Sequence, residues 1–251
     1  MQTFSNGQIF VSEFIGTAVL LLLGIGVCAN TTLKKAFGNG KDWLLISFGW
    51  GFAVFAGASI AWKSGAHLNP AVTLAVATTD GIPWSQVPLY FAAEISGAFV
   101  GAGLAYLMYK KQFDTHDEPE NTGGIFFTGP SVPNHFWNFV SELIATFVLI
   151  YWVLQSSPFE MGTGDSSVHF GNSALGYAGV AFVVIAIGAS LGGATGYAVN
   201  PARDFGPRVM YSLLPIKGKG SSNWGYAWVP FIGPLVGALI GAGVFLLVGG
   251  A

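Results

Sequence analysis

Two copies of the tripeptide Asn-Pro-Ala are the residues of this chain best suited to polar chemistry in an apolar setting. The copies are 131 residues apart, and each interrupts a hydrophobic stretch. Proline is favoured at the first position of a helix, and asparagine favours the capping position before it. Each motif therefore predicts a helix that starts inside an apolar region, with amide donors left to bind a polar molecule. The motif residues are Asn69, Pro70, Ala71, Asn200, Pro201 and Ala202.

A positively charged residue follows the second motif. Arg203 lies in an apolar stretch, where an unpaired charge is costly unless it faces protein or water. A buried ion pair with Asp204 is disfavoured, because adjacent residues of a helix do not share a face. We expect Arg203 to line a pore and to donate hydrogen bonds to solute oxygens. Two helix N-termini directed at one point, with this arginine, would repel cations and admit neutral molecules.

Two carboxylates stand early in matching apolar runs, at Glu13 and Glu142. An intramembrane carboxylate is a functional candidate by default. We favour a structural role, in which each accepts N–H groups from the loop before its own Asn-Pro-Ala motif. A proton relay is the alternative, but neither run holds a histidine or a second acid. His67 has no cysteine or paired histidine near it, so the sequence predicts no metal site and no cofactor.

Other landmarks repeat with nearly the same spacing as the motifs. Gly57-Ala58-Ser59 recurs at residues 188–190 with an offset of 131, and Ser12-Glu13 recurs at residues 141–142 with an offset of 129. The sequence therefore predicts an internal duplication within one domain of residues 1–251. The repeats cover approximately residues 9–108 and 137–249, joined by a loop of residues 109–136. Three full spans per repeat place the second repeat upside down relative to the first.

Six apolar segments approach the roughly 20 residues that cross a bilayer. Two shorter segments follow the motifs, and each covers only about half of a ~30 Å hydrocarbon core. We expect these half-helices to enter from opposite sides and to meet near the middle. The predicted spans are residues 9–29, 43–62, 86–108, 137–155, 174–193 and 226–249, and the half-helices are residues 70–79 and 201–211.

The composition supports an integral membrane protein. Charged residues make up 9% of the chain, against about 25% in a typical soluble domain. A net charge of -2 indicates no nucleic-acid partner. Cys28 is the only cysteine, so no disulfide forms within the chain. No nucleophile–base pair or metal-ligand set appears, so the sequence does not predict an enzyme.

The residues around both motifs resemble the aquaporin family, also called major intrinsic proteins. The stretches are SGAHLNPAVT at residues 64–73 and TGYAVNPARDFGPR at residues 195–208. The residue types at Asp204 and Pro230 are those typical of the aquaglyceroporin branch of the family, so the chain resembles this branch, which includes bacterial glycerol uptake facilitators. The resemblance implies an all-α, right-handed bundle of six transmembrane helices and two re-entrant half-helices. It also implies a homotetramer in the bacterial plasma membrane, with cytoplasmic termini.

The same resemblance implies a set of pore residues. The narrowest point of the implied pore would be lined by four residues, Trp50, Gly188, Tyr197 and Arg203. Carbonyl groups that accept solute hydrogen bonds would come from Gly65, Ala66, His67, Gly196, Tyr197 and Ala198. Tyr197 departs from the family pattern, because glycerol facilitators commonly have phenylalanine there.

The implied function is a passive channel for glycerol, water and other small neutral solutes that excludes protons and ions. Dihydroxyacetone, urea, hydrogen peroxide and protonated lactic acid remain open as further solutes. Two alternatives remain open as well, a coupled secondary transporter and a mainly water-conducting channel. Cytoplasmic loops usually carry an excess of lysine and arginine, and this count alone would place both termini outside the cell. The family resemblance implies cytoplasmic termini, and we adopt that orientation.

Overall fold

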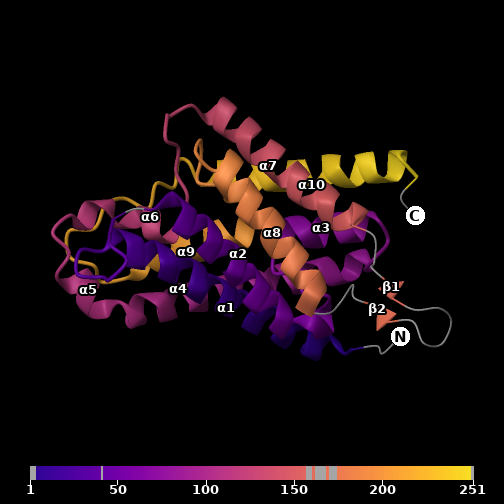
Figure 1. The fold of residues 1–251 in the computed structure, drawn as a ribbon, viewed down its shortest axis with the longest axis horizontal. Helices are drawn as coiled ribbons and strands as arrows, with labels where there is room; N and C mark the ends of the chain where they lie inside the picture. Colours follow the sequence, from indigo (N-terminus) through magenta and orange to yellow (C-terminus); the bar gives the residue numbers. More distant parts are fainter. Residues whose placement is uncertain (1–3, 41, 157–159, 162–167, 170–173, 250–251) are drawn as a thin grey trace.

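Six long helices form the body of the molecule (Figure 1). The structure is a computed structural model that describes residues 4–40, 42–156, 160–161, 168–169 and 174–249. The long helices are α1 (Asn6–Thr32), α2 (Trp43–Ile60), α4 (Val87–Met108), α7 (His135–Gln155), α8 (Ala174–Leu191) and α10 (Trp228–Leu247). Each overlaps one of the six predicted spans, with ends that differ by a few residues.

Two half-helices follow the Asn-Pro-Ala motifs, α3 (Pro70–Thr78) and α9 (Pro201–Leu213). The segment between the repeats contains two short helices, α5 (Lys110–Asp114) and α6 (Gly123–Phe126). Single 3-10 turns lie at Trp62–Ser64, Trp84–Gln86 and Pro119–Thr122. Two antiparallel two-residue strands, β1 (Glu160–Met161) and β2 (Val168–His169), lie in the connection between α7 and α8. The predicted all-α membrane fold is confirmed apart from this small strand pair.

The long helices are apolar around most of their circumference, as lipid requires. Within the described residues, five are long and apolar enough to cross a membrane, and the described part of α8, Gly176–Leu191, forms a shorter apolar helix. Large apolar side chains remain exposed on their outer faces, among them Phe52 and Phe182. In water such surfaces would aggregate, whereas in a bilayer they contact lipid tails.

The duplication is visible in the packing. A Cβ atom added to Gly97 of α4 would lie 2.4 Å from the carbonyl oxygen of Phe14 in α1. A Cβ atom added to Gly237 of α10 would lie 2.4 Å from the carbonyl oxygen of Leu143 in α7. Phe14 and Leu143 are 129 residues apart, the same offset as the two glutamates. Each repeat therefore brings its first and third long helices into backbone contact through glycine.

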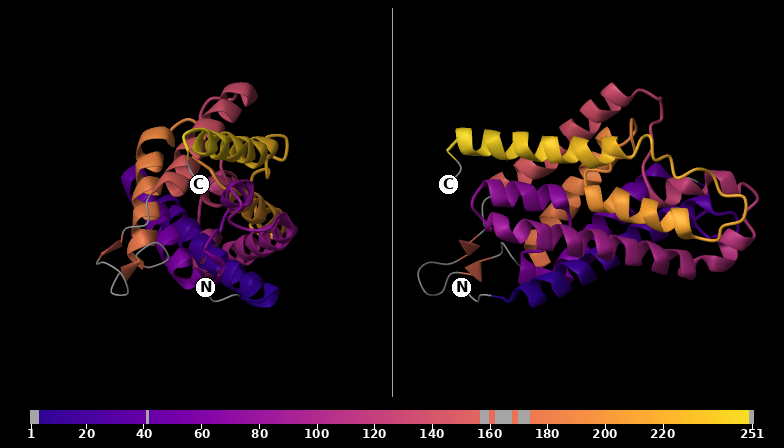
Figure 2. Two further views of the ribbon diagram at one scale, coloured as in Figure 1. Left: turned by 90° about the vertical axis from the view of Figure 1, so that its right-hand side faces the viewer. Right: turned by 180° about the vertical axis from the view of Figure 1, so that it is seen from behind.

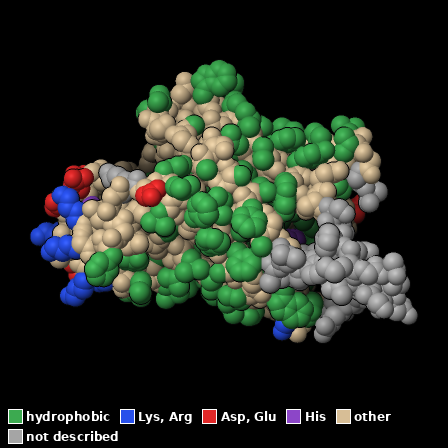
Figure 3. All heavy atoms as spheres, viewed as in Figure 1, with side chains coloured by type: hydrophobic (Ala, Val, Ile, Leu, Met, Phe, Trp, Pro, Cys, Tyr) green, Lys and Arg blue, Asp and Glu red, His purple; other side chains and the backbone are tan. Residues whose placement is uncertain are grey.

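Both termini lie toward one end of the bundle, as an even number of crossings requires (Figures 1 and 2). Charged side chains gather at the opposite end, around α5 and α6 (Figure 3). There Lys34 pairs with Asp117, and Lys110 pairs with Asp114. The hydrogen bond between Lys34 and Asp117 raises the pKa of the lysine and lowers the pKa of the aspartate. The chain thus has one strongly charged end and one end that carries both termini.

Candidate functional site

Both half-helices begin at the Asn-Pro-Ala motifs and are capped by the asparagines. Asn69 Oδ1 accepts a hydrogen bond from the backbone N–H of Ala71 at 2.9 Å. Asn200 Oδ1 accepts from the N–H groups of Ala202 at 3.0 Å and Arg203 at 3.2 Å. The predicted caps are therefore confirmed. Each cap satisfies backbone donors that would otherwise be unpaired at a buried helix start.

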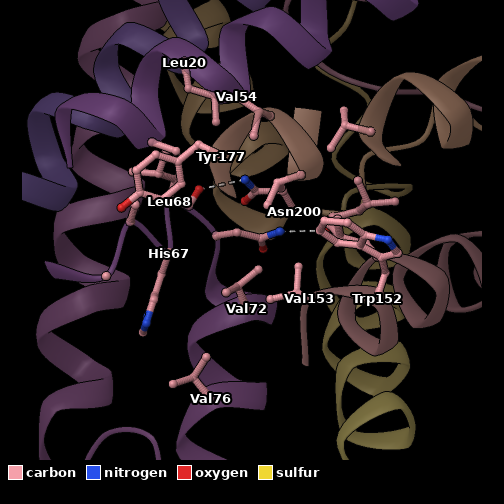
Figure 4. A pocket seen from close by; sticks show the side chains of 18 of the residues that line it. Leu20, Val54, His67, Leu68, Val72, Val76, Trp152, Val153, Tyr177 and Asn200 are labelled. Atoms are coloured by element: carbon pink, nitrogen blue, oxygen red, sulfur yellow. Dashed lines mark hydrogen bonds between the residues drawn. The ribbon is translucent and has the colours of Figure 1, made fainter. Parts of the chain in front are cut away.

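The two asparagines also hold the half-helices together. Asn69 Nδ2 donates to the carbonyl oxygen of Val199 at 3.0 Å, and Asn200 Nδ2 donates to that of Leu68 at 2.8 Å. Each bond crosses from one repeat to the other, and dashed lines mark such bonds in Figure 4. An amide nitrogen carries two hydrogens, so each asparagine keeps one donor for another partner. The two helix starts are thus fixed side by side with spare N–H groups between them.

The loops before the half-helices have the same unusual backbone. Left-handed φ angles occur at three positions in each loop, and the positions match at an offset of 131. Holding a non-glycine residue there costs about 1–3 kcal/mol, so the surrounding contacts must enforce it. The angles are 88°, 57° and 53° at Gly65, Ala66 and Leu68, and 85°, 41° and 44° at Gly196, Tyr197 and Val199.

Glu13 provides those contacts in the first repeat. Its buried carboxylate accepts from Ser64 Oγ at 2.6 Å and from the backbone N–H groups of His67 at 2.9 Å and Leu68 at 2.6 Å. With the N–H groups held on the carboxylate side, the loop keeps its left-handed turns.

Glu142 repeats the arrangement in the second half. Its carboxylate is also buried and accepts from Thr195 Oγ1 at 2.6 Å and from the N–H groups of Ala198 and Val199, both at 2.9 Å. The two networks match donor for donor. Both glutamates therefore act on the loop backbone, and neither borders the cavity described below.

Sequence reasoning missed a third buried carboxylate, Glu94 of α4. It accepts from Thr73 Oγ1 at 2.7 Å, and Thr73 Oγ1 lies 2.9 Å from His67 Nδ1. His67 also stacks on Tyr90 with ring centroids 4.5 Å apart. The available signal was an acidic residue in the middle of a predicted span. Glu94 braces the half-helix and fixes the ring of a residue beside the cavity.

Arg203 is buried against an aromatic ring. Its guanidinium carbon lies 4.0 Å from the ring centroid of Trp50, and Nη1 donates to the carbonyl oxygen of Phe126 at 3.1 Å. The indole nitrogen of Trp50 points at Cys28 Sγ at 3.4 Å. The charge is therefore held by a cation–π contact and a carbonyl. The remaining guanidinium N–H groups are available to a solute.

Gly188 and Tyr197 meet near this arginine. A Cβ atom added to Gly188 would lie 2.8 Å from Cζ and 2.9 Å from Oη of Tyr197, and 3.0 Å from Ser47 Oγ. The phenol therefore fills the space that glycine leaves. The buried Tyr197 hydroxyl lies beside Ser47, whose own Oγ donates to the Trp43 carbonyl at 2.9 Å. Trp43, which sequence reasoning also missed, packs edge-on against Tyr197 and donates from Nε1 to the Gly188 carbonyl at 2.9 Å.

Asp204 turns away from Arg203, as its place in the helix predicts. It accepts from the backbone N–H of Thr128 at 2.8 Å and from Thr128 Oγ1 at 2.7 Å. Its other oxygen pairs with Arg208 at 2.7 Å, and Arg208 donates to the Thr128 carbonyl at 3.0 Å. Sequence reasoning missed the pair of Asp204 and Arg208. The available signal was that two residues of opposite charge stand four positions apart in a predicted helix, where their side chains share a face. Asp204 thus fastens the segment after α6 to α9.

A cavity of about 1240 Å³ connects these parts. It reaches Trp50, Tyr197 and Arg203, passes Asn69 and Asn200, and continues to α3 and the C-terminal end of α7. Gly65, Ala66, His67 and Ala198 also line it, whereas Gly188 and Gly196 are not among the described lining residues. Apolar side chains of α1, α2, α7 and α8 form the rest of the wall. The glutamates Glu13, Glu94 and Glu142 are absent from its described lining.

Such a wall has one polar side and one apolar side. The loops supply turned backbone groups and two amides, while the long helices supply aliphatic and aromatic surface. A small molecule with hydroxyl groups on a carbon frame can satisfy both sides at once. Fixed N–H groups and a guanidinium beside such a cavity oppose the passage of cations.

Comparison with known proteins identifies the family. The family model "Major intrinsic protein" matches residues 1–245. The chain is 46% identical over 237 residues to the glycerol uptake facilitator protein of Bacillus subtilis, covering 94% of this chain and 82% of that protein. It is 45% identical to the probable glycerol uptake facilitator protein of Thermotoga maritima, covering 95% and 98% of the two chains.

A solved structure agrees with these sequence matches. The X-ray structure of the aquaglyceroporin from Plasmodium falciparum superposes with a TM-score of 0.81 at 31% identity and covers 96% of each chain. Both the sequence and the fold lead to one assignment. The chain belongs to the major intrinsic protein family of membrane channels.

Proposed function

We propose that this protein is a passive channel for glycerol and other small uncharged solutes, with water, and that it excludes protons and ions. The observation that carries the proposal is the two-sided cavity, which is lined by both asparagines and by an arginine. The relatives named as glycerol uptake facilitators support glycerol as the solute.

The proposed filter consists of Trp50, Tyr197 and Arg203, with Gly188 behind the phenol. Trp50 and Tyr197 offer ring surface to the carbon frame of a solute. Arg203 offers guanidinium donors to its hydroxyl groups. Gly188 contributes space, because its missing side chain lets the Tyr197 ring lie back against α8.

Beyond the filter, solute hydroxyls exchange partners along the loops. The proposed acceptors are the carbonyl groups of residues 65–67 and 196–198. The spare N–H groups of Asn69 and Asn200 donate at the meeting point of the half-helices. Because each step replaces one hydrogen bond with another, a neutral polar solute crosses without a large desolvation cost.

A coupled secondary transporter is the alternative from another class of protein. Coupling to protons or sodium needs a titratable or charged group that the ion can reach. Glu13 and Glu142 are occupied by loop hydroxyl and N–H groups, and Glu94 accepts from Thr73 of α3 with one of its oxygens. None of the three lines the described cavity. This arrangement favours a channel.

Glycerol movement through the full-length protein in liposomes is expected to follow the glycerol gradient alone. Among the described residues, no carboxylate lines the cavity, so ionophores that collapse proton or sodium gradients should leave the flux unchanged. Stopped-flow light scattering measures the flux, and empty liposomes are the control. A flux that requires either ion gradient would overturn the channel proposal.

Tyr197→Phe is expected to leave the ratio of glycerol to water permeability nearly unchanged, because the hydroxyl is buried beside Gly188 and Ser47 while the ring borders the cavity. The thermal midpoint is also expected to change little, since the hydroxyl makes only a poorly aligned contact with Ser47. Stopped-flow permeability and a thermal melt test both effects. A large change of the permeability ratio in folded protein would show that the hydroxyl faces the solute path.

The resemblance also supports the proposed assembly and location. We place the channel as a homotetramer in a bacterial plasma membrane, with one pore per subunit and both termini in the cytoplasm. The charged end around α5 and α6 then faces outward. Dihydroxyacetone, urea, hydrogen peroxide and protonated lactic acid belong to the same size class and are proposed as further solutes.

A further inference from the structure

The inner half of the cavity has aromatic walls of its own, contributed by Trp152 of α7 and Tyr177 of α8. We propose that these two rings form a second binding site for a small polyol, separate from the filter at Trp50 and Arg203. The proposal rests on the proposed solute channel and adds a place where solute pauses on the inner side.

Position along the helices separates the two sites. Tyr177 precedes Gly188 by 11 residues of the same helix, which is about 16 Å along its axis. Trp152 follows Glu142, which holds the second loop, by 10 residues of α7, or about 15 Å along the axis of that helix. A three-carbon solute is much shorter than either distance. It therefore cannot contact both sites at once.

Trp152 lies against the backbone of α8. A Cβ atom added to Gly179 would lie 2.8 Å from Cη2 and 3.3 Å from Cζ2 of Trp152. Glycine at this position lets the indole approach the helix and frees cavity space. Trp152 is one of the cavity-lining residues, and Figure 4 shows its ring beside Val153.

Tyr177 presents its ring, and not its hydroxyl, to the cavity. The residue is 6% exposed and lines the cavity, while its hydroxyl oxygen is buried. Tyr177 and Trp152 line the same cavity as Asn200, and Figure 4 shows all three. The two rings thus supply apolar surface to a cavity that also holds an amide donor. A water molecule gains little from contact with such an apolar surface, whereas the carbon side of a polyol is stabilised by it.

The loop before α3 supplies the polar side of the inner site. His67 lines the cavity, and its Nδ1 is fixed by Thr73, which leaves Nε2 for another partner. Gly65 and Ala66 border the same space with their turned backbone. Aromatic surface facing hydrogen-bonding groups repeats the chemistry of the filter. Three-carbon and four-carbon polyols are the solute class that fits it.

Fluorine NMR of the full-length channel in lipid nanodiscs tests the proposal directly. The eight tryptophans are replaced by 5-fluorotryptophan, and Trp50→Phe and Trp152→Phe assign the two resonances. Glycerol is titrated as the probe, with urea as a matched neutral control. Trp137 and Trp224 are 63% and 48% exposed and report any bulk solvent effect.

We expect the Trp152 resonance to move with glycerol in a saturable manner, in the parent and in Arg203→Val. A shift of the Trp50 resonance without a shift of the Trp152 resonance would overturn the inner site and leave the channel proposal intact. Equal shifts of all tryptophan resonances, or a Trp152 shift that disappears in Arg203→Val, would also overturn the inner site. No response at either ring, together with no glycerol flux, would remove both proposals.

A flux measurement adds a second readout. Trp152→Leu is expected to lower the ratio of glycerol to water permeability by roughly three- to tenfold, and Trp152→Phe is expected to restore most of it. Gly179→Ala is expected to push the indole into the cavity and to reduce glycerol flux more than water flux. An unchanged permeability ratio in both Trp152→Leu and Gly179→Ala would contradict the proposal.

Discussion

Glycerol flux through Gly188→His should fall by at least about tenfold, while water flux falls much less. Even the Cβ atom of the new side chain would lie 2.8 Å from Tyr197 Cζ, so the phenol must move toward Trp50 and Arg203. The imidazole and the displaced ring would then share the space that a three-carbon solute needs. Stopped-flow measurement of both permeabilities in the same liposomes gives the ratio.

Gly193→His is the matched control for this change. An added Cβ atom at Gly193 meets no atom within 4 Å, so the same side chain is introduced without crowding the filter. Its permeability ratio should equal that of the parent. Equal losses of glycerol and water flux in folded Gly188→His would show that Gly188 does not shape the filter.

Arg203→Val should let protons leak while neutral solutes still pass. A fixed unit charge at about 4 Å contributes about 4 kcal/mol at an effective dielectric constant near 20, so its loss should raise proton conductance at least about tenfold. The half-helix dipoles remain and keep part of the barrier. A pH-sensitive dye inside liposomes measures the leak under an imposed pH gradient.

Arg203→Lys separates the charge from the hydrogen-bonding geometry. Lysine keeps the positive charge but loses the planar fork of donors, so proton exclusion should persist while glycerol flux falls. If Arg203→Val folds, conducts glycerol and excludes protons as well as the parent, the ion barrier belongs to the asparagines and the helix dipoles alone.

Much of the architecture could be predicted because it depends on local rules. Proline and asparagine define where α3 and α9 begin, and span length is fixed by bilayer thickness. The duplication then predicts that whatever Glu13 does for one loop, Glu142 does for the other. These inferences need the spacing of a few residue types and no knowledge of packing.

The remaining site residues depend on which side of a helix faces the pore. Helices that are apolar around their whole circumference give no periodic signal that separates a pore-facing residue from a lipid-facing one. Trp152 and Tyr177 were therefore indistinguishable from tryptophans and tyrosines at the membrane surface. From the sequence alone, the Tyr197 hydroxyl could face either the pore or the neighbouring helices. The structure places it against Gly188 of α8, where it is buried. Glu94 was overlooked although its residue type alone marked it.

The bonds that Asn69 and Asn200 make to the opposite repeat constrain how the chain matures during synthesis. The amide of Asn69 finds its partner only at Val199, 130 residues later. At about 5–20 residues per second, the ribosome needs roughly 7–26 s to make that partner. Until then the first re-entrant loop enters the membrane with an open polar tip. The second repeat thus completes the first, and insertion must keep the early half accessible until the later half arrives.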